Sequence, residues 1–155
     1  MSIKMAGSSS RRPNRKRGQA LVEFALVFPI FMLVLSGIMD FGFMLYSRMS
    51  VINASREAAH AAIVTENHAN IALVAEGAAV ATAAQGGVSI SSSSVTVSCL
   101  ATSVNVSSPS PVDCSSAVPL DSVVVEVSYT YHSFFPLLFG ASIGLTSTTQ
   151  MVLEI

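Results

Sequence analysis

The chain has 155 residues, of which 51% are hydrophobic and only 11% are charged, and its formal net charge is −1. Because an average soluble domain carries about 25% charged residues, this composition argues against an ordinary soluble domain and indicates a membrane or a larger assembly. The length leaves room for one domain at most beside a membrane segment.

The charges are distributed unevenly along the chain. All nine acidic residues, beginning with Glu23, follow a basic block that holds six of the eight basic residues. Such a block beside an apolar segment is explained better by the positive-inside rule than by nucleic-acid binding, because it contains no aromatic residue that could stack on bases. We therefore predict a cytoplasmic N-terminus and no nucleic-acid partner. The six residues of the block are Lys4, Arg11, Arg12, Arg15, Lys16 and Arg17.

A single apolar segment follows the basic block. Residues 24–39 contain no charge, and a helix from Ala20 to Asp40 has a length of about 30 Å, which matches the hydrocarbon core of a bilayer. This register predicts that Asp40 lies near the outer interface, where its carboxylate reaches water. Pro29 lies inside the segment and is expected to bend the helix.

Two other kinds of signal fit this N-terminus less well. A cleaved secretory signal has a shorter apolar region than this one, and no good small-x-small cleavage site ends the run. The twin-arginine pattern starts at Arg11-Arg12 but continues with Pro13-Asn14 instead of a hydrophobic pair.

The junction between the basic block and the apolar segment has the layout of a prepilin leader. A basic run ends at Gly18, and Glu23 stands alone at the start of the apolar helix. Cleavage after Gly18 would make Gln19 the first residue. Glycine gives a protease access to extended backbone, and a carboxylate in lipid requires a positive partner. A neighbouring subunit's new α-amino group could be that partner; the alternative is an accidental interfacial Glu.

The stretch from 17 to 64 contains a set of spaced residues: Gly18, Glu23-Phe24, Pro29, Asp40-Phe41-Gly42 and Asn53-Ala54-Ser55-Arg56-Glu57-Ala58. In these positions it resembles the N-terminal signature of TadE-like proteins, which are minor pilins or pseudopilins of Tad (tight adherence) pilus systems. The resemblance implies their fold and assembly role, processing by a prepilin peptidase, and contacts with other pilin-like subunits and the pilus assembly platform.

The rest of the chain predicts an α+β fold outside the cytoplasm. The long N-terminal (transmembrane) helix is expected to continue to about Val64, and Asn70 can cap a second, short helix. Alternating apolar residues then predict a small antiparallel sheet of three to four strands. The expected second helix is Ile71 to Ala84, and the clearest strands are near Val95 to Cys99, Ser122 to Tyr131 and Leu145 to Glu154. The predicted parts are a leader (1–18), a transmembrane helix (19–46), a helical stem (47–84) and a sheet domain (85–155).

Two further features of the sheet domain lead to predictions. Cys99 and Cys114 are the only cysteines and flank a Ser/Pro loop, so we predict a disulfide between them. The apolar stretch 134–139 is expected to pack in the core; the alternatives are insertion into the membrane surface and contact with a partner.

No catalytic, cofactor-binding or metal-ligating motif was found, and no enzyme activity or small-molecule substrate is predicted. The apolar segment predicts a single-pass protein of the bacterial cytoplasmic membrane, and the resemblance to TadE-like proteins implies a pilin-like subunit that serves a Tad/Flp-type pilus and adhesion, either in the membrane or in a surface pilus. Its expected site residues are Gly18 and Gln19 for cleavage and Glu23 and Phe24 for assembly. The alternative function is an uncleaved, membrane-anchored binding or adhesion module.

Overall fold

The structure is a computed structural model that describes residues 15–101, 110–118, 120–136 and 140–153. The chain divides into two units, residues 1–37 and residues 38–155. The helix α1 (Arg15–Val64) begins in the first unit and ends in the second. Its end at Val64 agrees with the end expected from the sequence.

In the first unit, α1 is a single exposed apolar helix. Every side chain from Gln19 to Leu35 is exposed, and the helix continues through Pro29. Within the described residues, Gly18–Val64 is the one segment long and apolar enough to cross a membrane, and an 18-residue window within it has a mean hydropathy of 2.4. A helix that exposes apolar side chains over such a length is suited to lipid instead of water.

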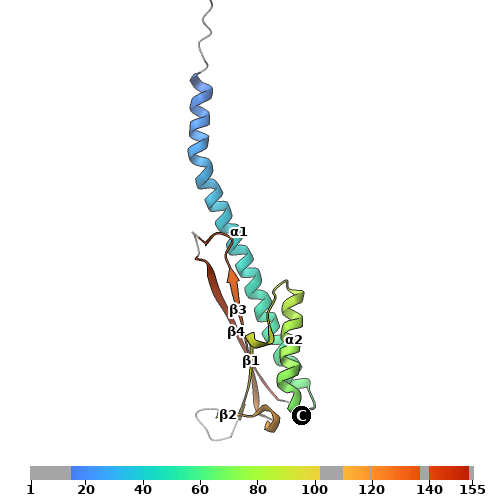
Figure 1. The fold of residues 1–155 in the computed structure, drawn as a ribbon. Helices are drawn as coiled ribbons and strands as arrows, with labels where there is room; N and C mark the ends of the chain where they lie inside the picture. The colour runs from blue at the N-terminus through green and yellow to red at the C-terminus, as the bar shows by residue number, and fades with distance from the viewer. Residues whose placement is uncertain (1–14, 102–109, 119, 137–139, 154–155) are drawn as a thin grey trace, which may run out of the picture. The chain divides into compact units, whose positions relative to one another are not determined.

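The second unit packs two helices on one face of a sheet (Figure 1). The four strands lie in the order β2-β1-β3-β4, and all neighbouring pairs are antiparallel. The predicted α+β fold is confirmed. After α1 the elements are η1 (His68–Asn70), α2 (Ile71–Gln85), η2 (Ser92–Ser94), β1 (Val95–Ala101), β2 (Ser110–Val112), η3 (Cys114–Ser116), β3 (Ser122–His132) and β4 (Ser142–Val152).

Small side chains bring α1 and α2 close together. Both helices bury alanines that recur mainly at intervals of four residues, which places them on one face of each helix. A Cβ at Gly86 would overlap the Ser50 hydroxyl group, so this position requires glycine. The buried alanines are Ala54, Ala58, Ala59 and Ala62 in α1 and Ala75, Ala79 and Ala83 in α2.

The start of α2 differs in detail from the prediction. Asn70 occupies the N-cap position, but its side chain makes no capping hydrogen bond. The Asn67 side chain instead accepts a hydrogen bond from the N–H of Ala69 at the start of η1. The short 3-10 turn therefore takes the capping interaction that the sequence suggested for α2 itself.

The sheet buries one face of β3 against the helices. Val123, Val125 and Val127 are fully buried, whereas Glu126, Ser128 and Thr130 are exposed on the opposite face. A polar contact also joins α1 to β4, because the buried Ser55 hydroxyl group lies 2.8 Å from Ser147 Oγ. The alternation of side chains along β3 is therefore the one expected from the sequence.

A disulfide joins Cys99 in β1 to Cys114 in η3, with the two Cα atoms 5.1 Å apart. It lies beside the short pairing of β1 with β2, in which Cys99 is opposite Val112. The Cys99 side chain is completely buried in the core. The disulfide therefore ties the end of the sheet to the turn that precedes β3.

Removing this disulfide is expected to destabilise the second unit. The two cysteines are 15 residues apart, and opening a loop of that length costs about 3 kcal/mol of stability in the chain-entropy model. The double replacement Cys99→Ser and Cys114→Ser should lower the free energy of unfolding by this amount, measured by urea titration of the full chain in detergent. Reductant should destabilise the unmodified chain similarly and leave the variant unchanged; equal stability without reductant would contradict the prediction.

Candidate functional site

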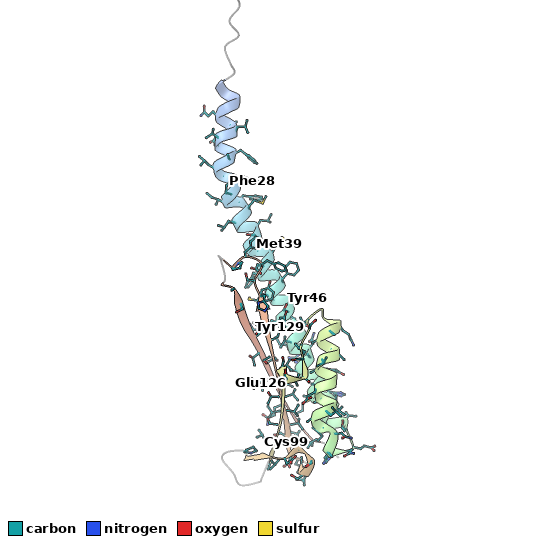
Figure 2. The ribbon with its side chains drawn as sticks, in the orientation of Figure 1. Phe28, Met39, Tyr46, Cys99, Glu126 and Tyr129 are labelled. Atoms are coloured by element: carbon teal, nitrogen blue, oxygen red, sulfur yellow. A yellow bond between two sulfur atoms is a disulfide. The ribbon has the colours of Figure 1, made fainter. Side chains whose placement is uncertain are left out.

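The first turns of α1 carry the four residues expected to act in cleavage and assembly. Gly18, Gln19, Glu23 and Phe24 are all exposed. Gly18, Gln19 and Glu23 line a shallow surface hollow together with Val22 and Leu26. Gln19 and Glu23 are four residues apart, so they lie on the same side of the helix. Figure 2 shows side chains projecting to both sides of α1 in this part of the helix.

The Glu23 carboxylate has an apolar environment on its own helix. Phe24 follows it and contacts Phe28, with the ring centroids 5.2 Å apart. In the part of the chain that the structure describes, no hydrogen bond or ion pair of Glu23 is found. An ionised carboxylate among apolar side chains is stabilised by an opposite charge. The first turns of α1 therefore offer an acid that a cationic group from another molecule can reach.

The backbone at Gly18 differs from the extended conformation expected for a cleavage site. The helix already begins at Arg15, so the bond between Gly18 and Gln19 lies within the first helical turn and a half. A protease that binds extended backbone must first unwind this turn. Glycine favours that step, because it destabilises a helix interior by about 1 kcal/mol relative to alanine.

A second polar site, in the second unit, surrounds Asp40. The Asp40 side chain is only 2% exposed. It accepts a hydrogen bond from the Tyr131 hydroxyl group at 2.6 Å and one from Ser133 Oγ at 2.5 Å. The backbone N–H groups of Phe134 and Phe135 donate to its two oxygens at 3.3 Å and 3.2 Å. Four donors therefore satisfy both oxygens of the carboxylate.

Asp40 thus differs from its interpretation as an interfacial residue that reaches water. Tyr131 is the last residue of the strand predicted from Ser122 to Tyr131 and Ser133 lies two residues beyond it, but no sequence pattern linked either of them to Asp40. Burial, together with the hydrogen bond to Asp40, raises the pKa of Tyr131 to about 12. The hydroxyl group consequently remains protonated at neutral pH and can donate to the carboxylate.

The comparison with protein families concerns the segment that contains Gly18, Glu23 and Asp40. Residues 18–60 match the family model of TadE-like proteins. The resemblance inferred from the sequence is confirmed over this segment. Comparison with curated proteins and with solved structures gave no match.

The TadE-like segment ends within α1, before α2 and the sheet. It includes Gly18, Glu23 and Asp40, whereas the donors Tyr131 and Ser133 lie beyond it. The aspartate of the TadE-like segment is therefore bound by residues of the sheet domain that the family model does not cover. This long-range contact could not be read from the segment alone.

The sheet domain also has an open hollow over the ends of β3 and β4. Its lining consists of hydroxyl, aliphatic and aromatic groups and includes no carboxylate or imidazole, which gives no indication of acid–base chemistry. Within the described residues, no group of three or more His, Cys, Asp and Glu side chains is arranged to hold a metal ion. The lining residues are Ser89, Ile90, Ser91, Ser94, Ser128, Tyr129, Thr130, Gly144, Leu145 and Thr146.

Proposed function

We propose that this chain is a membrane-anchored, pilin-like subunit of the minor pilin or pseudopilin type. It would serve the assembly of a Tad pilus and adhesion, and its role would be structural and not catalytic. The observation that supports the proposal best is the TadE-like match over residues 18–60, which begins at Gly18 and contains the exposed acid Glu23. The apolar helix that follows provides the anchor.

In this proposal the basic leader stays in the cytoplasm and the sheet domain lies outside it. The six cations before Gly18 favour this orientation. A disulfide between Cys99 and Cys114 is consistent with an oxidising compartment. A prepilin peptidase would cut after Gly18, and the apolar helix would remain on the mature chain. Glu23 would then bind a cationic group of another subunit during assembly.

A second candidate is a permanently anchored binding or adhesion module that is never cut. The observation that favours it is the helical backbone on both sides of the Gly18–Gln19 bond, which is a poor conformation for a protease substrate. Mass spectrometry of the full chain purified from its host membrane distinguishes the two. A mature chain that begins with Gln19 supports the pilin-like subunit, and a chain that keeps residues 1–18 supports the anchored module.

A bulky residue at position 18 is expected to prevent processing. We predict that Gly18→Leu leaves the leader attached, because leucine adds a side chain at the cut and also favours the helix that must unwind. The matched control is Gly42→Leu in the same helix, because an added Cβ meets no atom within 4 Å at either glycine. The control should be processed normally. Normal processing of Gly18→Leu, measured by mass spectrometry, would contradict the assignment of the cleavage site.

A further inference from the structure

The second unit exposes five aromatic side chains within a short stretch of α1 and directly after β3, and we call these five together the aromatic surface. Three of them lie on α1 beyond Asp40, and two lie in the loop that follows β3. Phe43 and Phe134 connect the two groups, with their ring centroids 5.6 Å apart. Phe134 is the most exposed of the five, at 68%. The members are Phe41, Phe43, Tyr46, Phe134 and Phe135.

This exposure corrects the expectation that the apolar stretch 134–139 packs in the core. Phe134 and Phe135 are exposed, as is Pro136; residues 137–139 lie outside the described residues. Exposed aromatic side chains of this number are unfavourable in water and mark a surface that contacts something apolar. The two alternatives left open by the sequence, lipid and a protein partner, therefore remain to be distinguished.

The loop is held at a fixed position along α1. Asp40 accepts hydrogen bonds from Ser133 Oγ and from the N–H groups of Phe134 and Phe135. The Ser133 hydroxyl oxygen also accepts a hydrogen bond from the N–H of Phe135 at 3.2 Å. Because Ser133, Phe134 and Phe135 are all attached to one buried carboxylate, the two phenylalanine rings are presented beside the helix at the level of Asp40.

The apolar run of α1 ends at Asp40. The uncharged residues 24–39 come directly before Asp40, and Arg48 is the first cation after it. The aromatic surface lies between these two boundaries. Aromatic side chains are enriched where a spanning helix leaves the hydrocarbon core, and an arginine just beyond can reach the lipid phosphates. Continuity with the apolar helix therefore favours lipid over a protein partner.

We propose that the loop after β3 is a second, peripheral membrane contact, in which Phe134 and Phe135 insert into the interfacial region of the outer leaflet. The occupant of the aromatic surface is the phospholipid bilayer itself. Asp40 acts as a positioning residue: it fixes the loop against α1 so that the rings enter the same lipid layer as Phe41 and Phe43. The inference rests on the membrane anchorage included in the proposed function and adds a lipid-binding site to the sheet domain.

The chain contains no tryptophan, so one introduced tryptophan reports on its own surroundings. The full chain is reconstituted in phosphatidylcholine and phosphatidylglycerol vesicles, with or without brominated acyl chains that quench indole fluorescence on contact. Phe134→Trp tests the loop. Phe31→Trp, which is 56% exposed on the apolar helix, tests the anchor, and Leu73→Trp, which is 70% exposed on α2, is the matched control away from the aromatic surface.

The expected result is a blue-shifted emission of Phe134→Trp and a fall of about twofold in its intensity in brominated vesicles. Phe31→Trp should be quenched at least as strongly, whereas Leu73→Trp should be unaffected.

If Phe31→Trp is quenched and Phe134→Trp is not, the loop does not contact lipid and the inference is overturned while the anchor stands. A blue-shifted Phe134→Trp without quenching would indicate burial against protein, such as a second copy, and would also overturn it. Absence of quenching at Phe31→Trp would overturn the membrane anchor as well.

Discussion

Replacing Glu23 with alanine is expected to abolish incorporation of the chain into the pilus assembly while leaving cleavage after Gly18 intact. Glu23 is exposed at the start of an apolar helix, and no partner for it is found among the described residues. In lipid or in a bundle of such helices, its charge is stabilised only if another subunit supplies a cation. In the proposed function, cleavage would create an α-amino group at Gln19 of a neighbouring subunit, and that group would be such a cation.

The geometry of the first turns of α1 makes this test specific. Gln19 and Glu23 are one helical turn apart, so after the proposed cleavage the α-amino group of Gln19 would lie about one turn from the carboxylate along the helix axis. A neighbouring subunit that is displaced along the helix axis could therefore place its own α-amino group beside the Glu23 carboxylate of this subunit. Without the carboxylate, the α-amino group of the neighbour would have to be desolvated without an opposite charge, which strongly disfavours docking.

Three variants distinguish the charge of Glu23 from its size. Glu23→Ala removes the whole group, and Glu23→Gln keeps the shape but removes the charge; both should fail to assemble. Glu66→Ala is the matched control, because Glu66 is exposed and lies beyond the end of α1. Cleavage is measured by mass spectrometry, and assembly by co-purification with the other pilus components and by counting pili. Normal piliation of the Glu23→Ala strain would refute the proposed role of this residue.

The elements with a regular local pattern could be predicted from the sequence. The first helix ends at Val64 as expected, and the second begins at Ile71 and ends one residue later than expected, at Gln85. The alternation of valines in β3 predicted its buried face correctly. These features depend on neighbours within a few residues, which is the range over which a periodic pattern carries information.

Features that depend on distant residues could not be predicted in this way. β2 contains only Ser110–Val112 and exists because it pairs with β1 beside the disulfide. β4 begins at Ser142, three residues before the expected start at Leu145. The added residues are paired because β3 continues to His132, which lies opposite Ser142. The largest difference concerns Asp40, whose hydrogen-bond donor Tyr131 lies 91 positions away in the sequence. A lone acid at the end of an apolar run suggests a carboxylate in contact with water until the donors that surround it are known.

The contacts of Asp40 lead to the second prediction, which concerns the stability of the whole sheet domain. Asp40→Ala should lower the Tm of the full chain in detergent by about 5 °C or more, since it removes the acceptor for four donors at once. The buried Tyr131 hydroxyl group would lose its charged partner, and the N–H groups of Phe134 and Phe135 would lose theirs. Tyr131→Phe removes one donor but leaves three, so it should lower the Tm by less than Asp40→Ala does.

Two further measurements separate loss of this network from a general effect of removing an acid. Asp113→Ala is the matched control, because Asp113 is exposed and its side chain accepts a hydrogen bond from the N–H of Ser115 in a short turn. Its loss should lower the Tm much less than the loss of Asp40. Hydrogen exchange should accelerate at Phe134 and Phe135 in Asp40→Ala and remain unchanged there in Asp113→Ala. If both variants have the same Tm and the two amides stay protected, the Asp40 carboxylate does not hold the loop, and the position of the aromatic rings beside α1 must have another cause.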